Sequence, residues 1–333
     1  MNKSFAGEFE LIDFIKNKFN SLIAKDSTGI GDDCAIIPLD SKKSLVVTTD
    51  MLVEEVHFLR DKIAPFILGK KSLAVNLSDI ASMGAAPVSS FLSFSLPDDV
   101  NDEWRRQFIE GYYELSEKFS VPLLGGDTTR SLDKITVSVT ALGTADNENL
   151  KRRNGAGQGD LICVNGYLGD SAAGFKLIQR ERWSDNPMEE YLINAHNDPD
   201  PLVNEGLWLG KNKYVTSMMD ISDGIGSDIR HILNASDVGA IIDLERLPLS
   251  SALTKISGKY GWDKYNLAVN GGEDYKLLFT VLKEDFQDLN KEYLQIFKRE
   301  ITVIGSIAQK DNGLMWKLYG DCVPDYFMGY RHF

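Results

Sequence analysis

The chain is poor in cysteine and has no long apolar run. Three cysteines occur in 333 residues, at Cys34, Cys163 and Cys322. An odd and widely spaced set gives neither a disulfide framework nor a zinc pattern, so we expect reduced thiols. No stretch approaches the roughly 20 apolar residues that a membrane span needs, and the first 22 residues carry charges throughout. We therefore expect a cytoplasmic protein with no membrane partner.

Basic residues are also in deficit. The sequence has 36 Lys and Arg against 49 Asp and Glu, a formal net charge of -13. Because nucleic-acid binding relies on Lys and Arg to neutralise phosphates, we expect no nucleic-acid partner. An anionic small molecule stays compatible with this charge if divalent cations held by carboxylates supply local positive charge. The sequence also contains no GxxxxGK[ST] loop, kinase signature set or GxSxG elbow.

The length and periodicity of the chain indicate two domains of mixed class. With 43% hydrophobic residues, 333 residues can bury more than one core. Helical spacing of apolar residues alternates with strand-like alternation, which is typical of an α/β or α+β fold. In the first half the predicted helices cover 9–23 and 104–119, and the predicted strands cover 44–49, 90–96 and 134–142.

A turn-rich basic segment, "ENLKRRNGAGQGD" (148–160), interrupts this pattern. We place the domain boundary there, between residues 1–150 and 151–333. The second half has no clear pattern over 181–214. Elsewhere it predicts strands at 161–166, 215–220, 239–243, 275–281 and 301–307, and helices at 171–180 and 225–233.

Carboxylates recur among small residues beside apolar runs. The stretch "VNLSDIASMGAAP" (75–87) carries Asp79, and a lone buried carboxylate is costly unless a cation or several donors meet it. Similar stretches are "GIGDDCA" (29–35), "VVTTDML" (46–52), "LLGGDTT" (123–129), "MMDISDGIGSD" (218–228) and "VNGGEDY" (269–275). Several buried carboxylates repel one another without cations between them, and Mg²⁺ prefers oxygen ligands. The recurrence therefore predicts a magnesium-dependent phosphate site.

Two of these stretches and one further glycine-rich turn suggest specific placements. In "VVTTD" we expect a strand to deliver Thr48, Thr49 and Asp50 to its C-terminal edge, where open α/β sheets bind ligands. In "LLGGDTT" two glycines would let a loop approach a phosphate while Asp127 faces a metal. The glycine-rich turn "GYLGDSAAG" (166–174) would open a helix and offer backbone N–H groups to an anion.

Each motif alone also has a structural interpretation. Sequences such as GDD and GGD are ordinary turns, and Asp170 is better explained as a helix N-cap. Asp223 and Asp228 suit capping or surface positions, and an isolated histidine such as His57 is most often simply packed. The ordered recurrence of the motifs favours the site.

The order of these motifs resembles one family. "GIGDDCA", "TTDMLVEEVHF", "AVNLSDIASMGA", "LLGGDTT", "GDSAAG", "DISDGIGSDI", "GGEDYKL" and the ending "MGYRHF" together resemble the thiamine-monophosphate kinase family. Its superfamily includes aminoimidazole ribonucleotide synthetase and selenophosphate synthetase. The resemblance implies a two-domain fold like that of aminoimidazole ribonucleotide synthetase, with an N-terminal mixed sheet that dimerises and a C-terminal α/β domain. It also implies ATP-dependent phosphorylation of thiamine monophosphate to thiamine diphosphate with several Mg²⁺ ions.

The resemblance also implies roles for individual residues. The implied phosphoryl transfer needs no general base, because the acceptor phosphate oxygen is already ionised. The implied metal positions are Asp33, Thr48, Thr49, Asp50, Asp79, Asp127, Asp220 and Asp223. The implied nucleotide contacts are Gly126, Asp127, Arg153 and Ser222, and the implied substrate contacts are His57, Glu273 and either Tyr330 or Phe327. A one-residue slip would exchange Asp33 with Asp32, and no motif marks the adenine pocket.

Three other functions compete with this hypothesis. One is a superfamily relative that activates an amide or a selenide, and another is a hydrogenase-maturation relative. The third is a regulatory or scaffold protein that binds a nucleotide without chemistry. The segment "VEEVHF" and the aromatic ending disfavour the first, and the full set of acidic residues disfavours the third. We also expect a homodimer that shares the strands at 90–96 and 134–142, because these strands carry apolar or small residues on both faces.

Overall fold

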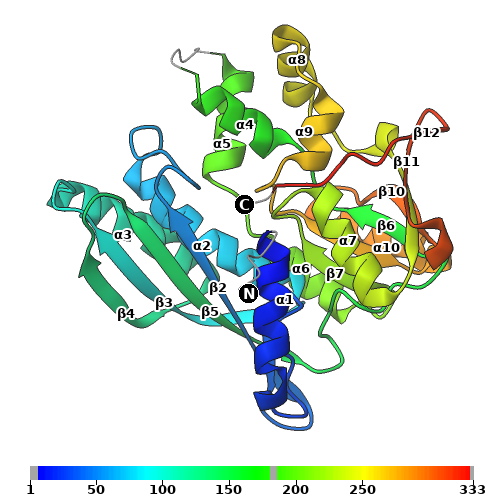
Figure 1. Cartoon of the computed structure of the whole chain (residues 1–333), viewed down its shortest axis with the longest axis horizontal. Coiled ribbons are helices and arrows are strands. Elements are labelled where there is room, and N and C mark those ends of the chain that lie inside the picture. The colour runs from blue at the N-terminus through cyan, green and yellow to red at the C-terminus, as the bar shows by residue number, and fades with distance from the viewer. Residues whose placement is uncertain (1–6, 181–185, 331–333) are drawn as a thin grey trace, which may run out of the picture.

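The computed structural model describes residues 7–180 and 186–330 and contains two β-sheets flanked by helices (Figure 1). The first sheet is mixed, because β3 and β4 are parallel while its other neighbours are antiparallel. In spatial order it consists of β1 (Ala35–Pro38), β2 (Lys43–Val53), β5 (Thr136–Asp146), β3 (Ala86–Leu96) and β4 (Leu123–Arg130).

One face of the first sheet is covered by α2 (Pro65–Ser82) and α3 (Asp102–Phe119) (Figure 1). On β5, Val137, Val139 and Ala141 are buried against this layer, as strand alternation requires. The two helices meet backbone to backbone, since a Cβ added at Gly111 would lie 1.8 Å from the carbonyl oxygen of Phe66. The opposite face of the sheet is half-exposed in the single chain.

The second sheet has seven strands. In spatial order they are β12 (Asp321–Val323), β11 (Leu314–Leu318), β8 (Gly239–Asp243), β10 (Thr302–Ala308), β6 (Leu161–Val164), β9 (Leu277–Val281) and β7 (Val215–Asp220). The helices of this half are α4 (Asp170–Ile178), α5 (Pro187–Asn197), α6 (Val203–Lys211), α7 (Ile225–Ser236), α8 (Ser251–Tyr260), α9 (Lys264–Asn270) and α10 (Phe286–Phe297).

Helix α2 lies between the two sheets and contacts both halves of the molecule (Figure 1). It packs on β2, β3 and β5 on one side and on α6 and β7 on the other. Small residues allow this close fit, because a Cβ at Gly206 of α6 would lie 2.2 Å from the carbonyl oxygen of Ala81. Thirteen of its 18 residues are buried, so α2 behaves as a shared core element.

The long amphipathic helices and the strongly alternating strands predicted from the sequence are confirmed. None of the described helices is long and apolar enough to cross a membrane. Helix α1 (Glu8–Phe19) forms as expected, yet none of its residues is buried, and Phe14 and Phe19 are more than half exposed. The unassigned stretch 181–214 contains α5 and α6, while residues 181–185 lie outside the described chain.

Two expectations about strands were wrong. Strand β2 does not end at Asp50 but continues to Val53, because β5 pairs with it along this whole length. The segment "LLGGDTT" is not a loop but the edge strand β4, paired in parallel with β3 and exposed at every residue.

Candidate functional site

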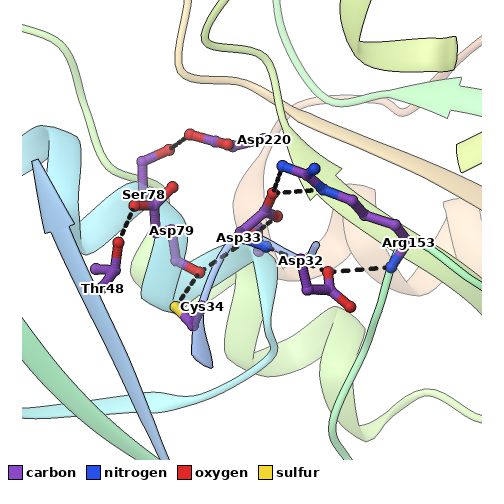
Figure 2. A network of polar contacts seen from close by, with 9 residues as sticks. Asp32, Asp33, Cys34, Thr48, Ser78, Asp79, Arg153 and Asp220 are labelled. Atoms are coloured by element: carbon purple, nitrogen blue, oxygen red, sulfur yellow. Dashed lines mark hydrogen bonds and ion pairs between the residues drawn. The ribbon is translucent and has the colours of Figure 1, made fainter. Parts of the chain in front are cut away.

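A cluster of carboxylates lies around the C-terminal half of α2. Asp79 accepts a hydrogen bond from the Thr48 hydroxyl of β2 at 2.5 Å, and Asp220 at the end of β7 accepts one from Ser78 at 2.6 Å (Figure 2). Ser82, one turn further along α2, donates to Asp33. The alternation of β2 points Thr48 and Asp50 toward α2. One helix and the two strands therefore bring together carboxylates from both halves.

The carboxylates of this cluster raise one another's pKa. Burial raises the pKa of Asp79 well above its ordinary value, and the charges of Asp50, Asp220 and Asp33 raise it further. Burial and nearby carboxylates likewise raise the pKa of Asp220 to about 8 and that of Asp50 to about 6. Such a site favours either protons or cations between its oxygens.

Arg153 lies on the same cluster. Its Nε and Nη2 donate to one oxygen of Asp33, at 3.0 and 2.6 Å, and its backbone N–H donates to Asp32 at 3.2 Å (Figure 2). The two adjacent acids thus differ in their partners, because the guanidinium group of Arg153 pairs with Asp33. Burial and the charge of Asp33 raise the pKa of Asp32 to about 7. Asp33 is therefore the acid that is paired with Arg153, and its role as a site residue stays a prediction.

Sequence reasoning placed Asp228 at a cap or on the surface, and this was wrong. The Asp228 side chain, in the first turn of α7, is 1% exposed and does not cap the helix. Neither of its oxygens has a hydrogen-bond partner among the described residues. Burial raises its pKa well above the ordinary value, and Asp223 and Asp220 add to this. The only signal was its place as the third acid of "DISDGIGSD".

A cavity of about 710 Å³ adjoins the cluster and is lined by both halves of the chain. Asp50 and Asp223 lie at its border with the carboxylates, and its wall includes His57, Glu273 and Tyr330. Other parts of the wall are apolar, contributed by Leu52, Phe175 and Leu267. An apolar pocket with a few polar groups suits a small molecule with ring systems, and the acidic border suits cations and their phosphates.

His57 and Tyr330, two ring-bearing residues of the cavity wall, are each held by a hydrogen bond to the backbone. The Nδ1 atom of His57 accepts a hydrogen bond from the Val53 N–H at 3.0 Å. The Tyr330 backbone N–H donates to the carbonyl of Asp223 at 2.8 Å, which fixes the C-terminal segment beside the cavity. Phe327, the alternative aromatic residue, is instead 2% exposed and packs edge-on against Trp316. The structure therefore places Tyr330, and not Phe327, at the cavity.

Some of the expected residues lie elsewhere. Asp127 lies on the exposed edge strand β4, beside Gly126, whereas the carboxylates that chiefly raise the pKa of Asp79 are Asp50, Asp220 and Asp33. The side chain of Thr49 is on the sheet face opposite to that of Thr48, because consecutive residues of a strand alternate. Its hydroxyl donates to the carbonyl of Val139 at 3.2 Å.

The turn before α4 was expected to offer free N–H groups, and Asp170 was expected to be the cap. Both expectations were wrong. The N–H groups of Gly169 and Ser171 donate to the carboxylate of Asp274, at 2.7 and 3.3 Å. Asp170 instead accepts hydrogen bonds from Tyr191 and Ser250. These N–H groups at the start of α4 are therefore hydrogen-bonded within the protein and are not free for an anion.

The carboxylate cluster is chemically suited to Mg²⁺. Its donors are all oxygens, and they are held close enough to repel one another. Among the described residues, no three His, Cys, Asp or Glu side chains converge as ligands of one ion. This arrangement still fits Mg²⁺, which is commonly held by one or two carboxylates together with waters and substrate phosphates.

Comparison with known proteins decides the family. The model of the AIR synthase related protein N-terminal domain matches residues 31–145, and the model of the C-terminal domain matches residues 157–317. The thiamine-monophosphate kinase of Escherichia coli strain K12 is 38% identical over 332 residues, which cover 98% of each chain. This chain belongs to the thiamine-monophosphate kinase family.

Other members of the thiamine-monophosphate kinase family agree. The enzyme of Buchnera aphidicola subsp. Acyrthosiphon pisum is 38% identical over 307 residues, 92% of each chain. The solved structure described as AaThiL complexed with AMPPCP and TMP has a TM-score of 0.86 at 35% identity, covering 100% of this chain and 99% of the other. Escherichia coli HypE, at 20% identity and a TM-score of 0.69, shares the fold alone.

Proposed function

We propose that this protein transfers the γ-phosphoryl group of ATP to thiamine monophosphate and so produces thiamine diphosphate. One observation carries this proposal: the cavity that contains His57, Glu273 and Tyr330 opens directly onto the carboxylates Asp50 and Asp223. The chain is also similar over its full length to a structure that contains AMPPCP and TMP. A ring-binding pocket beside an acidic phosphate site fits a donor and an acceptor that are both phosphates.

The protein's task in this reaction is mainly positioning. The acceptor oxygen is ionised at neutral pH, so no side chain has to remove a proton. His57, Glu273 and Tyr330 would hold the thiamine moiety, while Gly126, Ser222 and Arg153 would contact the nucleotide. Holding the two phosphates in line lowers the barrier, because the translational and rotational freedom is lost on binding and not in the transition state.

We further propose that carboxylates of the cluster would hold the Mg²⁺ ions that accompany the phosphates. Mg²⁺, when bound, neutralises the transferring phosphoryl group and polarises it. Asp33, Asp50, Asp79, Asp220 and Asp223 are the carboxylates that suit this role, since their charges act on one another across the cluster. Thr48 orients Asp79 through its hydroxyl. Thr49 and Asp127 remain predictions from the family resemblance.

Product analysis tests the reaction. Purified protein with ATP, excess Mg²⁺ and thiamine monophosphate should form thiamine diphosphate and ADP. Free thiamine should be a poor acceptor, because its hydroxyl would need a base. Protein that binds ATP but forms no thiamine diphosphate would contradict the proposal and favour the scaffold alternative.

The variant Asp79→Asn tests the metal site. Removing one negative charge should relieve repulsion, so we expect the melting temperature of the metal-free protein to hold or rise. Turnover with Mg²⁺ should fall by about two orders of magnitude or more. Melting temperature and kcat, measured with and without Mg²⁺ and ATP, check both. A variant that melts earlier without metal but turns over normally would mean that Asp79 has only a structural role.

We also propose a homodimer and retain the domain boundary near residue 150 as a proposal. The sheet face opposite to α2 is open in the single chain, and Met51 and Phe91 on it are 54% and 38% exposed. Sheets with an apolar open face generally bury it against another layer. A second copy of the chain would supply that layer.

A further inference from the structure

A lysine is completely buried beside the substrate cavity. Lys71, in the second turn of α2, is 0% exposed, which is rare for lysine unless its charge is paired. Its Nζ lies 3.0 Å from Oε2 of Glu273, which belongs to the other half of the chain. Lys71 belongs to no motif of the sequence, because its partner lies 202 residues away.

Glu273 has an unusual backbone. Its φ of 62° lies in the left-handed region, which is unfavourable for a residue with a Cβ, and Tyr275 two residues later has a φ of 49°. Its backbone N–H donates to the carbonyl of Ser222 at 2.7 Å, next to Asp223. Surrounding contacts must hold such a conformation, and strained residues of this kind cluster at binding sites.

A neutral histidine completes the arrangement. His196 of α5 places Nδ1 3.2 Å from the same Oε2 and 3.0 Å from the hydroxyl of Ser171. Burial and the nearby Lys71 lower its pKa to about 3, although Glu273 acts in the opposite direction. Lys71 is therefore the full positive charge in this set. The contacts of Lys71 and His196 both use Oε2 of Glu273, and Glu273 lines the cavity.

We propose that Lys71 is a positioning residue for the acceptor substrate. Its ammonium holds Oε2 of Glu273 and so keeps a charged carboxylate in the cavity wall, where the ligand would bind. An ionised carboxylate attracts cationic rings and amino groups, and thiamine carries both. This inference rests on the proposed function, and it adds a residue from α2 that acts on the acceptor through Glu273 and has no direct role toward ATP.

Lys71→Met tests the proposal, because it keeps the length of the side chain and removes its charge. We expect the KM for thiamine monophosphate to rise about tenfold or more, while the KM for ATP changes less than about twofold. The matched control is Lys70→Met, at the preceding residue of α2, whose Nζ pairs with Asp198 at 2.7 Å. The control should leave both KM values unchanged. Equal KM values for thiamine monophosphate in Lys71→Met and the wild type would overturn the proposal.

A double-mutant cycle with Glu273→Gln separates positioning from stability. If Lys71 acts through Glu273, then adding Lys71→Met to Glu273→Gln should not raise the KM for thiamine monophosphate further. A further rise equal to that in the wild-type background would overturn the proposal. If Lys71→Met alone fails to fold, the double variant, which leaves no unpaired buried charge, is compared with Glu273→Gln alone. A KM for thiamine monophosphate about tenfold higher in the double variant would then overturn the proposal.

Binding of thiamine monophosphate, measured by calorimetry without turnover, keeps the two proposals apart. Wild-type protein that neither binds nor phosphorylates this compound would contradict the proposed function. Wild-type protein that does both, together with an unchanged Kd in Lys71→Met, would contradict only the role of Lys71.

Discussion

His196 is a histidine that the fold keeps uncharged. Burial, followed by the charge of Lys71, lowers its pKa to about 3 from 6.5. In the unfolded chain the ring takes up a proton near pH 6.5, whereas in the folded protein it does so only near pH 3. The stability that depends on this difference is therefore complete above pH 6.5 and is lost as the pH falls from 6.5 toward 3.

The variant His196→Gln should remove this dependence. Between pH 7 and pH 5 we expect the free energy of unfolding of the wild type to fall by about 2 kcal/mol more than that of the variant. Urea unfolding of both proteins at the two pH values measures the difference. Parallel losses in the two proteins would show that the His196 ring titrates normally in the folded state.

Individual site residues were predictable where they belonged to a motif. Asp79, His57 and Glu273 stand in recognisable stretches, and the structure places them at the cluster or at the cavity. Lys71 was missed because its role comes from burial and from a partner 202 residues away. Asp228 stands in a motif, but its burial without a hydrogen-bond partner depends on tertiary packing. Spacing along a chain does not reveal such long-range pairing.

At the scale of elements, the contact between α2 and α3 depends on two glycines. A Cβ at Gly69 would lie 2.0 Å from the carbonyl oxygen of Phe108, and one at Gly111 would lie 1.8 Å from that of Phe66. Both obstacles are backbone atoms, so a larger residue forces the helices apart. This crossing supports the helix that carries Lys71, Ser78 and Asp79.

We expect Gly111→Ala to lower the free energy of unfolding by about 1–3 kcal/mol, as is typical of overpacked contacts. Gly258→Ala is the matched control, because Gly258 of α8 has nothing within 4 Å of its added Cβ. There the better helix propensity of alanine should raise stability by about 0.8–1 kcal/mol. Denaturant unfolding of both variants checks the opposite signs, and a stable Gly111→Ala protein would refute the close crossing.

The sequence predicted helices and strands better than it predicted what they pair with or pack against. Alternation identified β5, and helical spacing identified α3, because both elements have one buried face. The same reasoning could not tell that β2 continues past Asp50 or that "LLGGDTT" is an edge strand, since both depend on partner strands. The sequence also did not predict that α1 has no buried residue, because a helical pattern does not show which element the helix packs against.

At the scale of the whole molecule, the open face of the first sheet makes an oligomer testable. Sedimentation at micromolar concentration should give the mass of a dimer, about twice 37.1 kDa. Met51→Glu or Phe91→Glu should shift the protein toward the monomer, since each places a charge on the open face. Tyr319→Glu, at a residue 77% exposed in the second half, is the control and should stay dimeric. A monomeric wild type would contradict the homodimer.

The burial of α2 on every side affects how the molecule opens. Its amide hydrogens can reach solvent only when the layers around it separate, and these layers belong to both halves. Amide exchange from α2 should therefore be slow and should follow the global free energy of unfolding, whereas α1, with no buried residue, should exchange through local fraying. Since Lys71, Ser78 and Asp79 lie on this helix, the acceptor pocket and the carboxylate cluster would come apart in the same cooperative event.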